Sequence, residues 1–107
     1  MYYPSYLGIP IDVYRKSLDI ATSYHSLLKR REEFKGEEEK TRINEWQIAA
    51  VENALEGARD KVEERFISKN IFEGVQMMYI DLPMSISGMK RARKEFLIRL
   101  SVNLKLL

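Results

Sequence analysis

Apolar side chains recur at steps of three and four residues in three stretches of this chain, and that spacing is typical of helices with one buried face. The stretches run from residue 12 to about 34, from about 41 to 66, and from 85 to about 106. We therefore expect an all-α fold. The residues expected on the buried faces are Tyr14, Leu18, Ala21, His25 and Leu28, then Ile43, Trp46 (or Gln47), Ala50, Ala54, Leu55, Ala58, Val62 and Phe66, and finally Met89, Ala92, Phe96, Leu100 and Leu104.

The first two stretches predict an αα-hairpin of two long helices over residues 12–66. Asp12 is a suitable N-cap for the first helix, and the second is expected to continue through Gly57 at a cost of roughly 1 kcal/mol relative to alanine. A chain of 107 residues is long enough for one domain with a modest core. Residues 1–11 are expected to form an irregular arm, because they are interrupted by Pro4, Gly8 and Pro10.

Residues 67–107 predict a helix-turn-helix that completes this single domain. A helix stop at residues 67–70 is followed by a short apolar segment from Ile71 to Leu82, about three turns long if helical. Pro83 disfavours a helical conformation at the residue before it. Ser85 can then cap a longer, basic helix.

Charge is strongly segregated along the chain. The whole sequence carries a formal net charge of +2, but residues 85–107 hold six basic residues and one acid, a balance of +5. The preceding residues hold twelve basic and fifteen acidic side chains. A local excess of this kind attracts a polyanion even when the whole chain is nearly neutral.

The last helix has the pattern expected of a DNA recognition helix. The side of the helix opposite its apolar face carries short or polar side chains at the start and basic side chains farther on. Residues near the start of such a helix reach base edges, and Arg or Lys can pair with guanine in the major groove. We expect base contacts from Ser87, Lys90 and Arg91. The full set of expected DNA-binding residues is Ser85, Ile86, Ser87, Lys90, Arg91, Arg93 and Lys94, with Ser85 as N-cap, Ile86 against a thymine methyl, and Arg93 and Lys94 on phosphates.

Other classes of function lack the residues that they need. The chain has no cysteine and one histidine, so we expect no metal site and no cofactor. No catalytic triad pattern or phosphate-binding loop is present, and we expect no enzyme. Without a signal peptide or a stretch of roughly 20 apolar residues, a cytoplasmic protein with no membrane partner is expected. His25 is expected to be a partly buried core or interface residue, and the tyrosines of the arm (Tyr2, Tyr3 and Tyr6) to pack on a neighbouring subunit or on the hairpin.

The segments "RFISKNIFEG" and "LPMSISGMKRARKEFLIRLSVNL" resemble the DNA-binding half of small phage transcription regulators of the ArpU and RinA kind, a half that is itself similar to region 4 of sigma-70 factors. The segments "YHSLLKRREEF" and "EWQIAAVENALEGARDKVEERFI" look like the two preceding helices of such regulators, so the resemblance spans most of the chain. It implies that Ser85 begins the recognition helix and that Ser87, Lys90, Arg91 and Lys94 face DNA. Tyr79 and Pro83 depart from the small residue and the glycine that many helix-turn-helix motifs carry.

Three functions remain open at this point. The first is sequence-specific binding of double-stranded DNA, as a dimer, to regulate transcription of phage or prophage genes, with RNA polymerase as a further partner. The second is a DNA-packaging protein similar to a small terminase, which would assemble into a ring. The third is a helical adaptor or inhibitor that binds a host protein instead of DNA.

Overall fold

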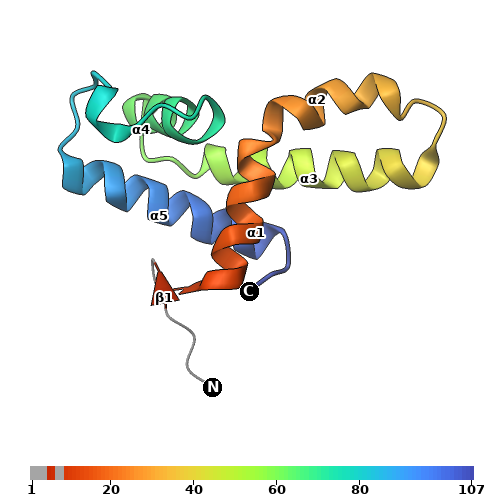
Figure 1. Cartoon of the computed structure of the whole chain (residues 1–107), viewed down its shortest axis with the longest axis horizontal. Helices are drawn as coiled ribbons and strands as arrows, with labels where there is room; N and C mark the ends of the chain where they lie inside the picture. Colours follow the sequence, from red (N-terminus) through yellow and green to blue (C-terminus); the bar gives the residue numbers. More distant parts are fainter. Residues whose placement is uncertain (1–4, 7–8) are drawn as a thin grey trace.

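In the computed structural model, which describes residues 5–6 and 9–107, the chain is mainly helical (Figure 1). The all-α expectation is therefore confirmed for these residues. The elements in chain order are β1 (Ser5–Tyr6), β2 (Ile9–Pro10), α1 (Ile11–Thr22), α2 (Tyr24–Glu33), α3 (Glu38–Glu56), α4 (Lys61–Ile67), the π-helical turn η1 (Ser68–Phe72), the 3₁₀ turn η2 (Met77–Tyr79) and α5 (Ile86–Asn103).

The arm that precedes α1 is more regular than the sequence suggested. Strands β1 and β2 pair antiparallel, with Tyr6 opposite Ile9. Pro10 occupies the N-cap position of α1 with φ −57°, so the helix begins before Asp12, which lies in its first turn. The prediction that Asp12 caps this helix is therefore wrong, although a carboxylate there still suits the helix dipole. Tyr2 and Tyr3 lie outside the described residues.

The first predicted helix is broken at Ser23 into α1 and α2, which point in different directions (Figure 1). The hydroxyl groups of Thr22 and Ser23 both donate to the carbonyl oxygen of Asp19, at 3.1 and 2.7 Å. Side chains that bond back to the preceding turn compete with the backbone ladder and bend helices. The bend changes which face is buried, so Leu27 enters the core and His25 is exposed. The expected partial burial of His25 is wrong.

The second predicted helix is also broken, because α3 ends at Glu56 and α4 begins at Lys61. A Cβ atom on Gly57 would lie 2.3 Å from Nε of Arg99, which donates to the carbonyl oxygen of Ala54 at 2.8 Å. The Arg99 side chain thus crosses the end of α3. Asp60 then caps α4 by accepting from the Glu63 N–H at 2.8 Å.

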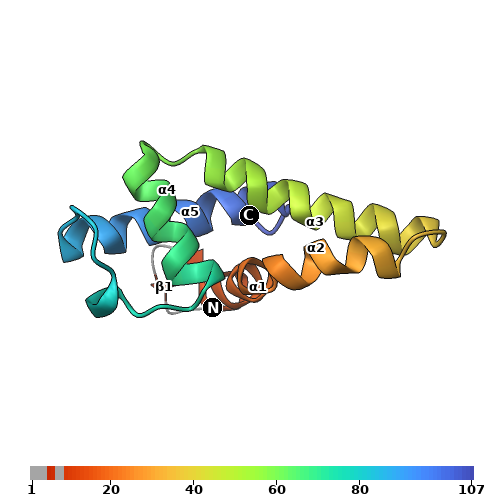
Figure 2. The same ribbon diagram turned by 90° about the horizontal axis from the view of Figure 1, so that it is seen from above.

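The buried stripe of α3 agrees with the predicted one at Ala50 and Ala54 and differs from it nearer the start of the helix. Asn44, Ile48 and Val51 are buried, whereas Ile43 and Trp46 are 48% and 44% exposed. The Asn44 side chain donates to the Leu27 carbonyl oxygen at 2.9 Å and joins α3 to α2, which lies antiparallel beside it (Figure 2).

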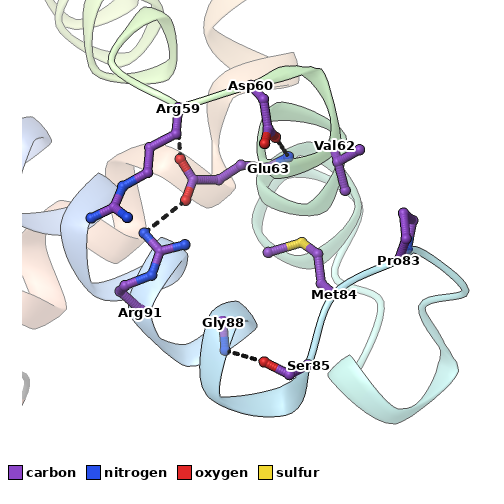
Figure 3. Close-up of a pocket in the computed structure, with 9 residues that line it drawn as sticks. All are labelled: Arg59, Asp60, Val62, Glu63, Pro83, Met84, Ser85, Gly88 and Arg91. Carbon is purple, nitrogen blue, oxygen red and sulfur yellow. Dashed lines mark hydrogen bonds and ion pairs between the residues drawn. The ribbon is translucent and has the colours of Figure 1, made fainter.

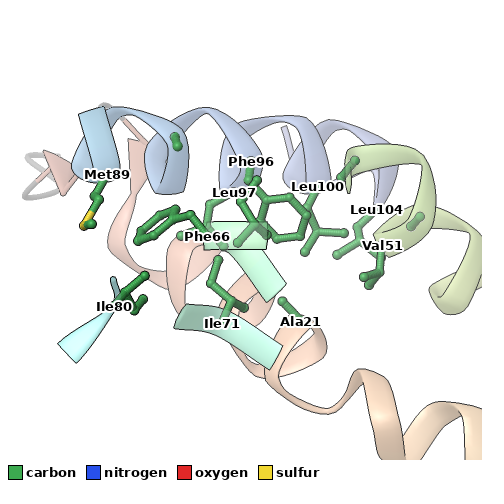
Figure 4. Packing of buried hydrophobic residues seen from close by; sticks show 14 residues of the cluster. Ala21, Val51, Phe66, Ile71, Ile80, Met89, Phe96, Leu97, Leu100 and Leu104 are labelled. Atoms are coloured by element: carbon green, nitrogen blue, oxygen red, sulfur yellow. The ribbon is translucent and has the colours of Figure 1, made fainter. Parts of the chain in front are cut away.

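Helix α5 is the centre of the fold and packs against α3, α1 and α4. Its predicted buried face is confirmed (Figure 4), with Met89, Ala92, Phe96, Leu100 and Leu104 all at most 3% exposed. Phe66 of α4 and Ile71 of η1 complete this core. Burying a side chain such as Phe96 contributes about 1.5–3 kcal/mol. The hydroxyl groups of Ser17 and Ser101, 2.6 Å apart and buried, join α1 to α5.

The segment from Ile71 to Leu82 is not the short helix that the sequence predicted. It leaves η1 at Phe72 and then forms a connection whose one regular turn is η2. Gly74 has a left-handed conformation (φ +73°), and the Asn70 amide donates to the Val75 carbonyl oxygen at 3.0 Å. These features end the helix and fold the connection back. The helical segment that precedes the connection is α4 with η1.

Candidate nucleic-acid interface

The start of α5 is a capped and accessible helix N-terminus. Ser85 has an extended backbone (φ −74°, ψ 160°), and its hydroxyl oxygen accepts from the Gly88 N–H at 3.0 Å (Figure 3). The predicted N-cap is therefore confirmed. The remaining free N–H groups of the first turn, together with the helix dipole, make this end favourable for an anion.

Four of the expected DNA-binding residues are exposed on the first half of α5: Ile86, Ser87, Lys90 and Lys94. The last three are separated by three and four residues and so share one side of the helix. Neither lysine forms an ion pair within the part of the chain that the structure describes. Both ammonium groups are therefore available to an external anion.

Arg91 lies four residues after Ser87 and three before Lys94, and so on the same side of α5, but it is bound within the protein. Its Nη1 atom lies 3.1 Å from a carboxylate oxygen of Glu63 in α4 and 3.1 Å from one of Glu95 in α5. Glu63 is 3% exposed and also accepts from the Arg59 backbone N–H at 2.6 Å. The approach of Arg91 to Glu63 lacks hydrogen-bond alignment, so the attraction is between charges. Arg91 holds α5 against α4.

Arg93 is likewise engaged within the protein. Its guanidinium donates to the side-chain oxygen of Asn70 in η1 and, at 3.3 Å, to the hydroxyl group of Tyr14 in α1. Because these contacts join three elements, Arg93 positions α5 in this structure instead of facing outward with Lys90 and Lys94.

A hollow of about 270 Å³ lies between α4 and the start of α5 (Figure 3). Its charged lining residues are Arg59, Asp60, Glu63 and Arg91, and all four already bond within the protein. Nearby Arg99 has its pKa lowered by burial, an effect that Glu63 and Glu95 oppose. Because these charged groups are paired with each other or with their neighbours, the hollow offers few free polar groups to bind a small charged ligand.

The connection before α5 contains exposed apolar residues that the sequence reasoning did not assign to a site. Met78 and Tyr79 in η2 are 74% and 73% exposed, and Ile86 at the start of α5 is 51% exposed. The available signal was the unbroken apolar run from Met77 to Ile80, which lacks the three- and four-residue spacing of a buried helix face.

No family model, curated protein or solved structure matches this chain. Among the described residues no cluster of potential metal ligands is found, and no helix there is long and apolar enough to cross a membrane. The geometry of α5 is thus the basis for a functional proposal.

Proposed function

We propose that this protein binds double-stranded DNA sequence-specifically through the first half of α5 and regulates transcription of phage or prophage genes. The observation that carries the proposal is the capped start of α5, where Ser87, Lys90 and Lys94 are exposed on one side and the two lysines have no partner among the described residues. The opposite side of α5 is held in the core through Met89 and Phe96.

This arrangement suits the major groove. A groove about 12 Å wide accepts one α-helix whose far side is packed on its own protein. In the proposed complex Ser87 and Lys90 face base edges and Lys94 lies on a phosphate, while Ile86 packs against a thymine methyl. The free N–H groups beyond Ser85 suit a backbone phosphate.

The proposed motif is a helix-turn-helix with a long connection. Helical segment α4–η1 takes the place of the first helix, and α5 is the recognition helix. Arg91 and Arg93 hold the two together through Glu63 and Asn70. In this proposal the two arginines fix the angle between the helices, and Arg91 reaches DNA only if its carboxylate partners release it.

The test is selection of duplexes from a randomised DNA pool. We expect wild-type protein to enrich a defined site and the variant Lys90→Ala/Lys94→Ala to lose that enrichment. The variant Lys35→Ala is the control, because Lys35 is exposed and follows α2 at the end of the molecule far from the start of α5 (Figure 1). Equal enrichment by both variants would contradict the assignment of α5.

The exposed apolar residues Met78, Tyr79 and Ile86 favour a second candidate, in which this end of the molecule binds a host protein. RNA polymerase is one such partner. If the protein acts only in this way, it should not bind duplex DNA at moderate salt. Binding of the protein partner should then survive replacement of Lys90 and Lys94 and be lost in Met78→Ser/Tyr79→Ser.

A further inference from the structure

The other end of α5 packs against α1 and α3 (Figures 1 and 2). A second surface with exposed apolar side chains, those of Trp46 and Val102, lies there. Two shallow grooves meet there at Trp46, whose side chain is 44% exposed. One groove, of about 280 Å³, is lined by Lys16, Asp19, Ile20, Trp46, Leu104 and Leu106. The other, of about 300 Å³, is lined by Trp46, Ala49, Ala50, Asn53, Val102, Asn103 and Lys105. We call these residues together the Trp46 surface.

We propose that the Trp46 surface is a two-fold interface for a second copy of this chain. In this arrangement the Trp46 ring of each copy enters the alanine-lined groove of the other. A two-fold interface uses the same patch on both copies, so the patch must complement itself. A half-exposed indole directly beside a groove that includes the small side chains of Ala49 and Ala50 meets that requirement in shape, and polar residues (Asn53, Asn103 and Lys105) line the same groove.

The charges at the edge of the surface are also self-complementary. Lys16 and Asp19 are exposed, lie one turn apart on α1 and border the apolar groove. Neither forms an ion pair within the described part of the chain. Across a two-fold axis, Lys16 of each copy can meet Asp19 of the other, which gives two matched pairs. A partner of unrelated sequence would have to supply both charges and the groove independently.

The proposed interface does not depend on DNA binding. The distance that it sets between the two α5 helices, however, bears on DNA recognition, and this part of the inference rests on the proposed function. Lys90 and Val102 are twelve residues apart on α5, which is about 18 Å at 1.5 Å per residue. If the two α5 helices lie in one line and meet end to end at the two-fold axis near Val102, the two Lys90 positions lie about 36 Å apart. Half-sites on DNA are about 34–36 Å apart when separated by one helical turn. The proposed dimer thus predicts a palindromic site with this spacing.

Sedimentation equilibrium without DNA, over a wide range of protein concentration, tests the interface. We expect a dimer that dissociates on dilution, together with a shift of Trp46 emission to longer wavelength, since Trp46 is the sole tryptophan of the chain. Ala49→Arg fills the groove and should give a monomer with unchanged helicity. Met78→Ser is the control, because Met78 is an exposed apolar residue in another part of the structure and should leave the dimer intact.

Charge exchange provides a second test that does not depend on packing. Lys16→Asp should weaken dimerisation about tenfold, because two exposed pairs are lost and like charges face each other. Lys16→Asp/Asp19→Lys should restore it. A monomer at every concentration, a ring of more copies, a dimer unaffected by Ala49→Arg, or a failed restoration would each overturn the interface. A dimer that enriches no duplex would leave the interface standing and reject the proposed function.

Discussion

Replacing Glu63 by glutamine tests the contact that holds α5 against α4. The substitution preserves size but removes the negative charge of a carboxylate that is 3% exposed. A glutamine oxygen can still accept from the Arg59 N–H, now 2.6 Å from the carboxylate. The glutamine NH₂ group then faces the Arg91 guanidinium, which sets a donor against a donor.

The magnitude follows from the burial of the two partners. Breaking a fully buried ion pair costs about 3–5 kcal/mol, whereas the side chain of Arg91 is 38% exposed and keeps Glu95 as a second partner. In addition, the hydrogen bond from the Arg59 N–H passes from a charged acceptor, where such bonds contribute about 1.5–3 kcal/mol, to a neutral one, where they contribute about 0.5–1.5 kcal/mol. We therefore expect Glu63→Gln to lower the free energy of unfolding by about 2 kcal/mol. At about 2.1 cal/mol/K of unfolding entropy per residue, this corresponds to a Tm lower by about 9 °C.

Thermal and urea unfolding followed by circular dichroism at neutral pH measure this change. Glu64→Gln is the matched control, because Glu64 is the adjacent residue and its partially exposed side chain pairs with Lys61 at 3.6 Å. It should cost less than about 0.5 kcal/mol. Equal stability of Glu63→Gln and wild type would show that the Glu63 charge does not hold α5 against α4. The same substitution removes one of the two carboxylate partners of Arg91, so in the proposed DNA complex it should tighten binding at fixed salt while it weakens the fold.

Three further predictions follow from individual contacts. Gly57→Ala should destabilise the protein by about 1–2 kcal/mol in urea unfolding, because the new Cβ displaces the Arg99 side chain from the Ala54 carbonyl oxygen. A more stable variant would show that the Arg99 contact at the end of α3 does not stabilise the fold. Burial and the hydrogen bond to Glu52 raise the pKa of Tyr24 from 10.0 to about 12. The folded state thus keeps a proton that the unfolded state loses, and this contribution to stability is full below pH 10 and is lost as the pH rises toward 12. Unfolding free energy should fall more steeply in that window for wild type than for Tyr24→Phe, and parallel curves would contradict the assignment. Arg93→Ala should lower the Tm, because it removes the bonds to Asn70 and Tyr14, whereas Lys94→Ala should leave the Tm unchanged; equal effects on the Tm would argue against a positioning role for Arg93.

Local signals in the sequence were sufficient to predict α5. Its cap at Ser85 and its buried face from Met89 to Leu104 depend on residues within a few turns of each other, and both are present in the structure. The breaks in the earlier helices depend on other parts of the chain. At Gly57 the missing side chain leaves room for Arg99 of α5 across the end of α3, a contact that no pattern local to residues 41–66 predicts. Gly57 and the pair Asp60 and Glu63 were nevertheless local signals of a break.

The side chains of the candidate interface divide in the same way. Sequence spacing placed Lys90 and Lys94 on the exposed side of α5, where the structure has them. It could not place Arg91 against Glu63, which comes from a different helix. The spacing of four residues between Arg91 and Glu95 was a local signal that Arg91 would be paired. The apolar run from Met77 to Ile80 resembles a buried helical segment in sequence. In the structure Gly74 turns the chain before it, and the run forms only the short turn η2.

The most direct test of DNA binding by α5 is the salt dependence of affinity for a selected duplex, measured by fluorescence anisotropy. The logarithm of affinity falls with the logarithm of salt concentration by about 0.9 for each phosphate that the protein neutralises. In the proposed complex Lys94 lies on a phosphate and Lys90 on a base edge, so Lys90→Ala/Lys94→Ala should reduce the slope by about 0.9, while Lys35→Ala leaves it unchanged. An unchanged slope in the double variant, or no binding by wild type at low salt, would show that the first half of α5 does not bind DNA.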